Sequence, residues 1–290
     1  MSQPVLIEND HLRLEIWPQF GGKVSSMIDK ADNHELLFTL PTELPTRCQY
    51  AMPYADGWAA GWDECFPALA PGPYPLHPYE SVGVPDHGEV WPLPTTSVPN
   101  RDGITTVWHG LRFGYRLTRK LYLDQSSVIC EYTLINLAPF DFRFAWTPQI
   151  LLSALSPTEI DLGESHRLHS GLDWPALDEQ NAYDRFENLP EGLAWRVHGQ
   201  SPVRTPARVR YVDRKRLLQI EFDSETGVEG FWSVSVNTGS SAGQRHLSVA
   251  PVTARCDDLA AAVADGSAAT LPATFHPPKD SPIYNPTKRT

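Results

Sequence analysis

Apolar and polar residues alternate with a period of two along much of the chain, a pattern that predicts β-strands rather than helices. The alternating segments are short and are separated by turn residues such as Asn9-Asp10 and Gly21-Gly22. They cover residues 12–17, 23–29, 35–38, 142–152, 207–213, 216–222 and 231–237. Strands that follow one another without helices between them indicate an antiparallel sandwich or barrel.

The clearest pair of strands is YRLTRKLYLD followed by SSVICEYTLINL, with DQSS (124–127) as the turn. One face of the first strand carries Tyr115, Leu117, Leu121 and Leu123, and the other carries Arg116, Thr118, Lys120 and Tyr122. This alternation predicts a long antiparallel hairpin. Only residues 256–266, CDDLAAAVADG, have the acidic start, alanine-rich middle and terminal glycine of a short helix.

Two stretches interrupt the strand pattern. Residues 41–100 are rich in proline, glycine, tryptophan and acidic residues, and residues 163–206 form a second polar stretch. Their aromatic residues supply apolar surface to bury, so we expect long ordered loops, which often carry function. No internal repeat or linker divides the sequence, and we therefore predict one all-β domain over residues 1–290.

Length and charge exclude several classes of partner. A chain of 290 residues can bury a large core without disulfides or a structural metal. A net charge of −11 argues against nucleic acid and anionic membranes as partners.

Cys48, Cys65, Cys130 and Cys256 are scattered, which is typical of a reducing compartment. With no signal peptide or membrane-spanning run in view, we expect a cytoplasmic protein.

The first long loop collects side chains that suit a sugar site. It contains Trp58, Trp62, Asp63, Glu64, His87, Glu89 and Trp91. A sugar presents paired hydroxyls and an apolar C–H face, so its site needs carboxylates, imidazoles and an aromatic plane. A purely structural loop is the alternative. In that case Asp63 and Glu64 cap a turn, and His87 forms a surface ion pair with a neighbouring carboxylate.

Other chemistries find less support in the sequence. His166 and His169 are three residues apart with Glu164 nearby, but no HExxH motif or further ligand set accompanies them. There is no glycine-rich phosphate loop and no GxSxG motif. We therefore predict neither a metal nor a cofactor.

The order of the motifs resembles the aldose 1-epimerase (galactose mutarotase-like) superfamily. The resemblance rests on NDHLRLEIWPQFGGKVSSMIDKADNHELLF near the start, PDHGEVW at 85–91, EYTLINLAPFDFRFAWTPQILL at 131–152, and FWSVSVNTG, HLSVAPVT and DDLAAAVADG towards the end. It covers most of the chain. It implies a large antiparallel β-sandwich, the supersandwich, with a sugar site on its concave sheet and the surrounding loops.

The resemblance also implies a mechanism and two departures from it. In active mutarotases a glutamate takes a proton from the O1 hydroxyl of the sugar, and a histidine protonates the ring oxygen. By the motif match, the histidine's position is Gln149 and the glutamate's position is Ala250. Neither residue can give or take a proton at neutral pH. A second histidine of the family site matches His87.

Three hypotheses remain open at this point. The first is an isomerase whose catalytic groups are relocated to His87, Glu64 and Glu89. Neighbouring carboxylates favour the protonated form of His87, which would be the acid, and one carboxylate would be the base. Its substrate contacts are predicted at Asp63, Trp62, Trp91, Gln149 and Arg143. The second hypothesis is a non-catalytic sugar binder or sensor, and the third is an interaction protein. Arg47, Arg101 and Arg167 are candidates for an acidic group on the ligand, whose presence stays open, as does the oligomeric state.

Overall fold

The structure is a computed structural model that describes residues 3–40, 44–154, 158–163, 168–169, 184–185, 189–240 and 244–273. Glu164 and His166 of the candidate metal group, together with Arg167, lie outside these ranges. The described residues form antiparallel sheets with one short α-helix, so the predicted all-β sandwich class is confirmed.

The described strands form four larger sheets and two small pairs. The first sheet contains β1 (Val5–Glu8), β2 (Leu12–Trp17), β3 (Lys23–Asp29), β5 (Trp62–Cys65) and β13 (Thr147–Ile150), with β4 (His34–Glu35) on β3. The second contains β11 (Ser127–Asn136), β10 (Tyr115–Asp124), β9 (Gly103–His109) and β8 (Thr96–Pro99). The third, the five-stranded sheet, contains β14 (Leu152–Ser153), β22 (Arg245–Val252), β21 (Phe231–Thr238), β18 (Ala194–Gly199) and β16 (Leu168–His169). The fourth contains β17 (Asp184–Arg185), β15 (Thr158–Asp161), β19 (Ala207–Tyr211) and β20 (Arg216–Ile220).

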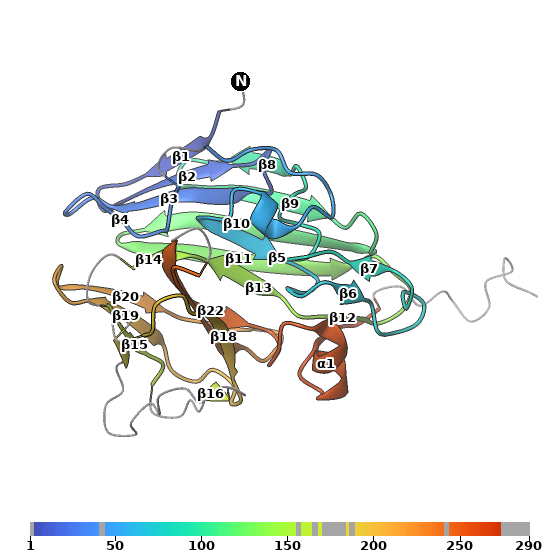
Figure 1. Cartoon of the computed structure of the whole chain (residues 1–290). Coiled ribbons are helices and arrows are strands. Elements are labelled where there is room, and N and C mark those ends of the chain that lie inside the picture. The colour runs from blue at the N-terminus through green and yellow to red at the C-terminus, as the bar shows by residue number, and fades with distance from the viewer. Residues whose placement is uncertain are drawn as a thin grey trace, which may run out of the picture.

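One apolar core joins all four larger sheets. It includes Leu14 from β2, Leu121 from β10, Val209 from β19 and Val249 from β22. The N-terminal strands occupy the upper half of Figure 1 and the C-terminal strands the lower half. The two halves meet where β13 lies against β22. The first and third sheets are therefore neighbours. The two small pairs are sheets of their own: β12 (Phe142–Phe144) with β23 (Ala269–Leu271), and β6 (Gly72–Pro73) with β7 (Gly83–Val84).

The predicted hairpin is confirmed in its register and its faces. Strands β10 and β11 pair from Tyr115 opposite Asn136 to Asp124 opposite Ser127. The odd-numbered positions of β10 are buried and the even-numbered ones are exposed or half-buried. One buried odd position is a charged residue, Arg119, which the apolar pattern alone does not explain.

Elsewhere the strands differ from the expected segments. The expected loop over 41–100 contains β5 to β8, and the expected loop over 163–206 contains β18, a strand in the interior of the five-stranded sheet. The single strand expected over 142–152 is divided into β12, β13 and β14, because its three parts pair with three different strands.

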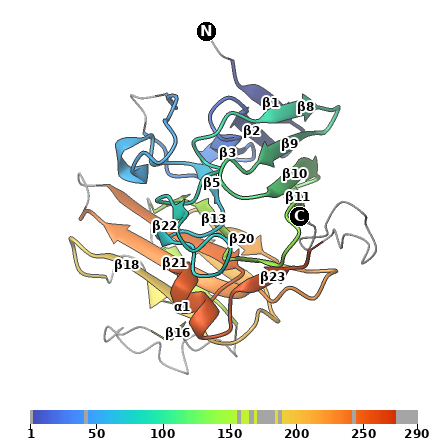
Figure 2. The same ribbon diagram turned by 90° about the vertical axis from the view of Figure 1, so that its right-hand side faces the viewer.

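The helix is shorter than its sequence pattern. It is α1 (Leu259–Ala264), and it starts after Asp258 because that side chain accepts a hydrogen bond from the Ala261 N–H at 2.7 Å. Gly266, with a φ of +78°, follows its end. Figure 2 shows α1 beside the five-stranded sheet.

Candidate functional site

Strands β5 and β13 send the predicted site residues to two opposite faces. In their register Gln149 lies opposite Asp63, and Ile150 lies opposite Trp62. Because neighbouring residues of a strand point to opposite faces, Asp63 and Gln149 share one face, while Trp62 and Glu64 share the other. Trp62 belongs to the apolar core, so the face with Glu64 is the interior of the sandwich.

Glu64 is fully buried and bridges two sheets. Its carboxylate pairs with Nη1 of Arg119 on β10 at 2.9 Å, and both side chains have no exposed surface. It also accepts hydrogen bonds from the Tyr132 hydroxyl and the Trp146 indole N–H, each at 2.8 Å. The Arg119 guanidinium in turn lies 5.5 Å from the Trp62 ring. These contacts join the sheets from within.

Glu89 is also fully buried, and hydrogen bonds to its carboxylate come from two separate loops. It accepts hydrogen bonds from the Leu111 N–H at 3.0 Å, the Arg112 N–H at 3.2 Å and the Tyr50 hydroxyl at 3.2 Å. Arg143 donates through Nη1 to the Ala268 carbonyl at 3.3 Å, which links β12 to the segment before β23.

Asp63 lies on the opposite face from Glu64 and is held by two donors. Lys23 forms a buried ion pair with its carboxylate, and the Tyr54 hydroxyl donates to it at 2.8 Å. Lys23 Nζ also donates to the carbonyls of Trp58 and Ala60. This ammonium group therefore fixes the segment that carries Tyr54, in the 3₁₀ turn η1 (Tyr54–Asp56), next to β5.

His87 has a defined ring orientation. Its Nδ1 lies 2.8 Å from Oδ1 of Asp86, and its ring stacks on Tyr54 at a centroid distance of 4.0 Å and an interplanar angle of 10°. The hydrogen bond with His87 is the main cause that lowers the pKa of Asp86. Trp91 is buried and donates through Nε1 to the Asp86 carbonyl at 3.0 Å, so it stabilises the main chain next to His87.

The five-stranded sheet has one apolar and one polar face. Its apolar face contributes Val197, Val234 and Val249 to the core. Register places the intervening residues together on the other face, which we call the polar face: Arg196, His198, Ser233, Ser235, Asn237, His246, Ser248 and Ala250. Ala250 lies opposite Ser233, which in turn lies opposite His198.

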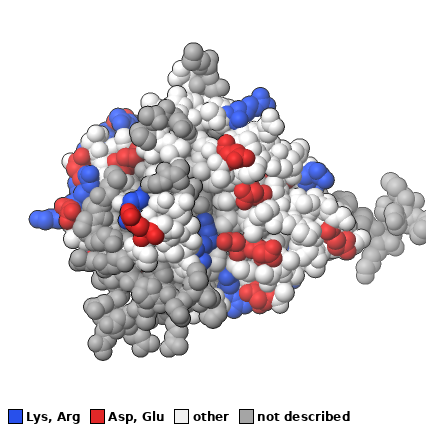
Figure 3. Space-filling model, viewed as in Figure 1, with Lys and Arg blue, Asp and Glu red and all other residues white. Residues whose placement is uncertain are grey.

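A charged network connects the polar face to Gln149. Arg196 donates through Nη2 to the Gln149 side-chain oxygen at 2.6 Å, and its Nε lies 3.6 Å from Oδ2 of Asp257. His198 Nε2 lies 3.0 Å from Oδ1 of the same carboxylate. Burial raises the pKa of Asp257, but the hydrogen bond from His198 and the charges of Arg196, His198 and His87 outweigh it, and the net effect is a lowered pKa. Figure 3 shows acidic residues gathered beside a narrow basic strip in the middle of the molecule, viewed as in Figure 1.

His246 stays neutral on this face. Burial, together with the charge of Arg196, lowers the pKa of His246 to about 4. Its ring lies 4.9 Å from that of Phe38. Within the described part of the chain, three buried polar atoms here have no hydrogen-bond partner: Nδ1 of His198, Oγ of Ser233 and Nδ1 of His246. Buried polar groups in proteins are nearly always paired, so such a cluster is typical of a ligand or water site.

A pair of main-chain hydrogen bonds connects His87 to the network. The His87 N–H donates to the Leu69 carbonyl at 2.7 Å. Ala70, which follows Leu69, donates its N–H to the Asp257 carbonyl at 3.0 Å. The structure thus brings together His87, Gln149 and Asp63 from the predicted set. Glu64 and Trp62 point to the interior, and Glu89, Trp91 and Arg143 contact other segments.

Sequence reasoning missed Arg196, His198, His246 and Asp257. A signal for the first two was present, because in AWRVHG the apolar Trp195 and Val197 alternate with Arg196 and His198. The sequence pattern places Asp257 only in the acidic start of a helix. Across the described ranges, no three His, Cys, Asp or Glu side chains form a group that could hold a metal ion. No described helix has the length and apolar character needed to cross a membrane.

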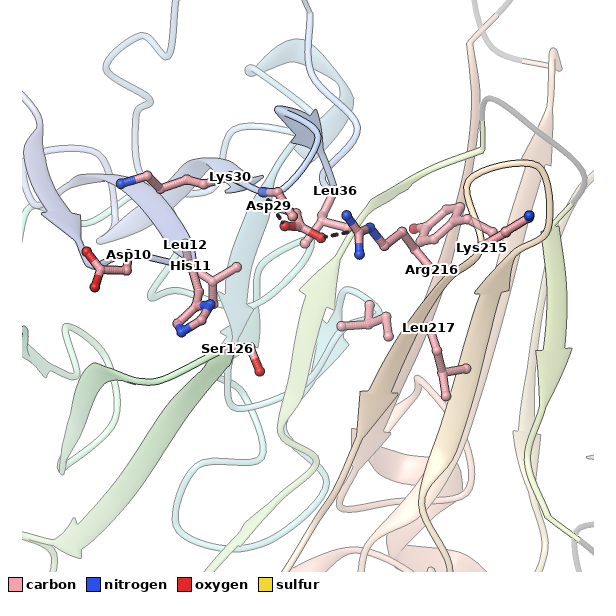
Figure 4. A pocket seen from close by; sticks show the side chains of 13 residues that line it. Asp10, His11, Leu12, Asp29, Lys30, Leu36, Ser126, Lys215, Arg216 and Leu217 are labelled. Carbon is pink, nitrogen blue, oxygen red and sulfur yellow. Dashed lines mark hydrogen bonds and ion pairs between the residues drawn. The ribbon is translucent and has the colours of Figure 1, made fainter.

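Among the described residues, two cavities outside the polar face stand out for their volume. The first, of about 410 Å³, lies between the β2–β3 region and the β19–β20 hairpin, where Arg216 Nε and Asp29 Oδ2 are 3.4 Å apart (Figure 4). None of the predicted site residues lines it. The second, of about 380 Å³, is lined by Leu44, Thr46, Asp56, Gly57 and Trp58, and so adjoins the turn that carries Tyr54.

Comparison with known proteins supports the fold through structure alone. No family model and no curated protein matches the sequence. The Slr1438 protein from Synechocystis sp. PCC 6803 superposes with a TM-score of 0.67 and 16% identity over 94% of this chain and 92% of that one. A galactose mutarotase-like protein from Clostridium acetobutylicum gives 0.61 and 12% over 88% and 86%. A galactose mutarotase related enzyme from Lactobacillus acidophilus gives 0.59 and 12% over 88% of each.

These likenesses define the class of fold. The chain has the galactose mutarotase-like sandwich fold that the order of its motifs predicted.

Proposed function

We propose that the protein binds a monosaccharide or a sugar derivative on the polar face of the five-stranded sheet and interconverts its anomers. The observation that carries this proposal is the network of Gln149, Arg196, His198 and Asp257, which adjoins unpartnered buried polar atoms. Alternating donors and acceptors on one surface suit the hydroxyl groups of a sugar ring. The fold of the mutarotase-like neighbours supports the same class of ligand.

A second candidate function is sugar binding without catalysis. Gln149 and Ala250 favour it, because neither can transfer a proton at the positions where the resemblance implies an acid and a base. Gln149 is instead an acceptor for Arg196. Both candidates share the ligand class and differ only in whether anomer exchange is accelerated.

The test measures binding and exchange separately. NMR saturation transfer detects binding to a panel of monosaccharides, and polarimetry of freshly dissolved α-glucose and α-galactose measures exchange. We expect binding with acceleration, and a loss of roughly 10²- to 10³-fold in rate for His87→Ala if it supplies general acid help. His77→Ala is the matched control, because His77 is an exposed histidine of the same long segment, paired with Glu80.

Each outcome selects one function. Saturable binding without acceleration supports the non-catalytic binder. Absence of binding across the panel contradicts both candidate functions and favours a protein-interaction role for the long loops of the chain.

A further inference from the structure

Asp257 occupies a position in this site that the motif match assigns to no function. It precedes α1 and is part-exposed, with 30% of its side-chain surface accessible. Two residues of β18 fix its two oxygens: His198 contacts Oδ1 at 3.0 Å and Arg196 lies 3.6 Å from Oδ2. Residues two apart on a strand point to the same face, so both partners approach from the polar face.

His87 is linked to Asp257 through the main chain and through its charge. Consecutive residues, Leu69 and Ala70, hold the main chains of His87 and Asp257. The charge of His87 acts on the Asp257 carboxylate together with those of His198 and Arg196. With Nδ1 of His87 held by Asp86, its other nitrogen, Nε2, is available to a ligand. The His87 side chain is 19% exposed, so both groups are accessible in part.

We propose, on the basis of the proposed function, that Asp257 is the general base and His87 the general acid of anomer interconversion. Asp257 takes over the role that Ala250 cannot fill, and His87 takes over the role that Gln149 cannot fill. His198 and Arg196 act as positioning residues that hold the Asp257 carboxylate ionised and oriented.

The proton transfers balance without any further reactant. The Asp257 carboxylate removes the proton of the O1 hydroxyl as the C1–O1 bond becomes a carbonyl. The bond between C1 and the ring oxygen breaks, and its electron pair goes to the ring oxygen, which takes a proton from Nε2 of protonated His87. Rotation about C1–C2 and reversal of these steps return both protons and give the other anomer.

The other carboxylates predicted from the sequence are less suited to this role. Glu64 faces the interior, where Arg119, Tyr132 and Trp146 surround it. Glu89 is fully buried, and its oxygens accept from a loop main chain and from Tyr50. Asp63 pairs with Lys23 beneath Tyr54. Asp257 alone among these four carboxylates combines partial exposure with an effect of the His87 charge.

The decisive variant is Asp257→Asn, which keeps the shape of the side chain and removes its basicity. We expect the exchange rate constant to fall roughly 10²- to 10³-fold while sugar affinity changes only a few-fold. Asp102→Asn, at an exposed aspartate in the turn before β9, is the control and keeps the wild-type rate. Circular dichroism checks that each variant is folded.

The pH profile separates catalysis from a structural role. The wild-type rate should fall as the pH drops through the pKa of Asp257, because a protonated carboxyl cannot accept the O1 proton. His198→Phe removes a hydrogen bond that lowers the pKa of Asp257. The acidic limb of the pH–rate profile of this variant should therefore move to higher pH. If Asp257→Asn does not fold, this shift decides: an unmoved limb overturns the inference.

Failure of this inference differs from failure of the proposed function. A wild-type protein that accelerates exchange, with Asp257→Asn equally active, overturns only the assignment of Asp257. Loss of affinity in parallel with rate makes Asp257 a binding residue and overturns the assignment too. A wild-type protein that neither binds nor accelerates contradicts the proposed function itself.

Discussion

At the scale of the residue, His87 and Gly88 set the direction of the side chains around them. Both have left-handed backbone conformations, with φ of +59° and +75°. The Glu89 N–H next to them donates to the Phe66 carbonyl at 2.8 Å. A Cβ on Gly88 would lie 2.2 Å from that carbonyl oxygen, so only glycine fits both the conformation and the close approach.

We therefore expect Gly88→Ala to lower the free energy of unfolding by about 2–4 kcal/mol, from left-handed strain plus overpacking. Gly227→Ala is the matched control, because Gly227 has a φ of +75° but no described heavy atom within 4 Å of a Cβ there. It should lose only about 1–2 kcal/mol. Urea denaturation measures both, and equal losses would show that the contact with Phe66 does not matter.

The left-handed backbone at His87 and Gly88 also explains how much the sequence could predict about the motif PDHGEVW at 85–91. The sequence places His87 between Asp86 and Glu89, so it predicts that either carboxylate can pair with the imidazole. In the structure His87 contacts Asp86, while Glu89 turns towards Leu111 and Arg112. Left-handed residues redirect the chain, so proximity in sequence does not give the direction of a side chain. The catalytic role of His87 stays a prediction.

At the scale of the element, strand β10 carries a buried ion pair across the sandwich. Arg119 lies on the apolar face of the hairpin and meets Glu64 of β5. A neighbouring residue of β10, Lys120, meets Glu131 of β11 on the exposed face, with about half of each side chain accessible. One strand thus offers a buried and an exposed ion pair for comparison.

Arg119→Met should lower the free energy of unfolding by about 3–5 kcal/mol, because it leaves the Glu64 carboxylate buried without its counter-charge. Lys120→Met should change it by less than about 1 kcal/mol, since exposed pairs are screened by water. Chemical denaturation gives both values. Adding Glu64→Gln to Arg119→Met should restore part of the loss, and a double variant worse than the sum would contradict this account.

The elements also show why some strands were predictable and others were not. The hairpin of β10 and β11 is long and alternates throughout, so its pairing followed from the sequence. Strand β18 lies inside the polar stretch 163–206, whose composition predicts a loop, although Trp195 and Val197 alternate there with Arg196 and His198. The hydrogen bond between Arg196 and Gln149 joins residues 47 positions apart, and no local pattern specifies such a contact.

At the scale of the whole molecule, the order of motifs predicted the fold, while the site depends on how distant strands are aligned. His87 is in a loop, Gln149 is in the first sheet, Arg196 is in the five-stranded sheet and Asp257 precedes the helix. The meeting of β13 and β22 brings the two sheets together. Sequence gives the residues on each strand, but the neighbours of a strand depend on the packing of the whole chain.

A single cooperative domain is also a prediction that the shared core allows to be tested. Val249 is fully buried in β22, in the cluster that also contains Leu14 and Leu121 of the N-terminal sheets. Val249→Ala should lower the free energy of unfolding by about 2 kcal/mol, as expected for loss of buried apolar surface. Val98→Ala on β8, where the side chain is 62% exposed, should change it by less than about 0.5 kcal/mol.

The course of unfolding tests the prediction of a single cooperative domain more directly than the decrease in the free energy of unfolding does. If the four larger sheets unfold with their shared core, far-ultraviolet circular dichroism and tryptophan fluorescence should give one coincident transition in urea, for both the wild type and Val249→Ala. The substitution lies in the C-terminal half, yet both probes should shift to the same new midpoint, because Trp62 of the N-terminal half lies in the same core as Val249. Separate midpoints for the two probes would mean that the two halves of the sandwich unfold as independent units.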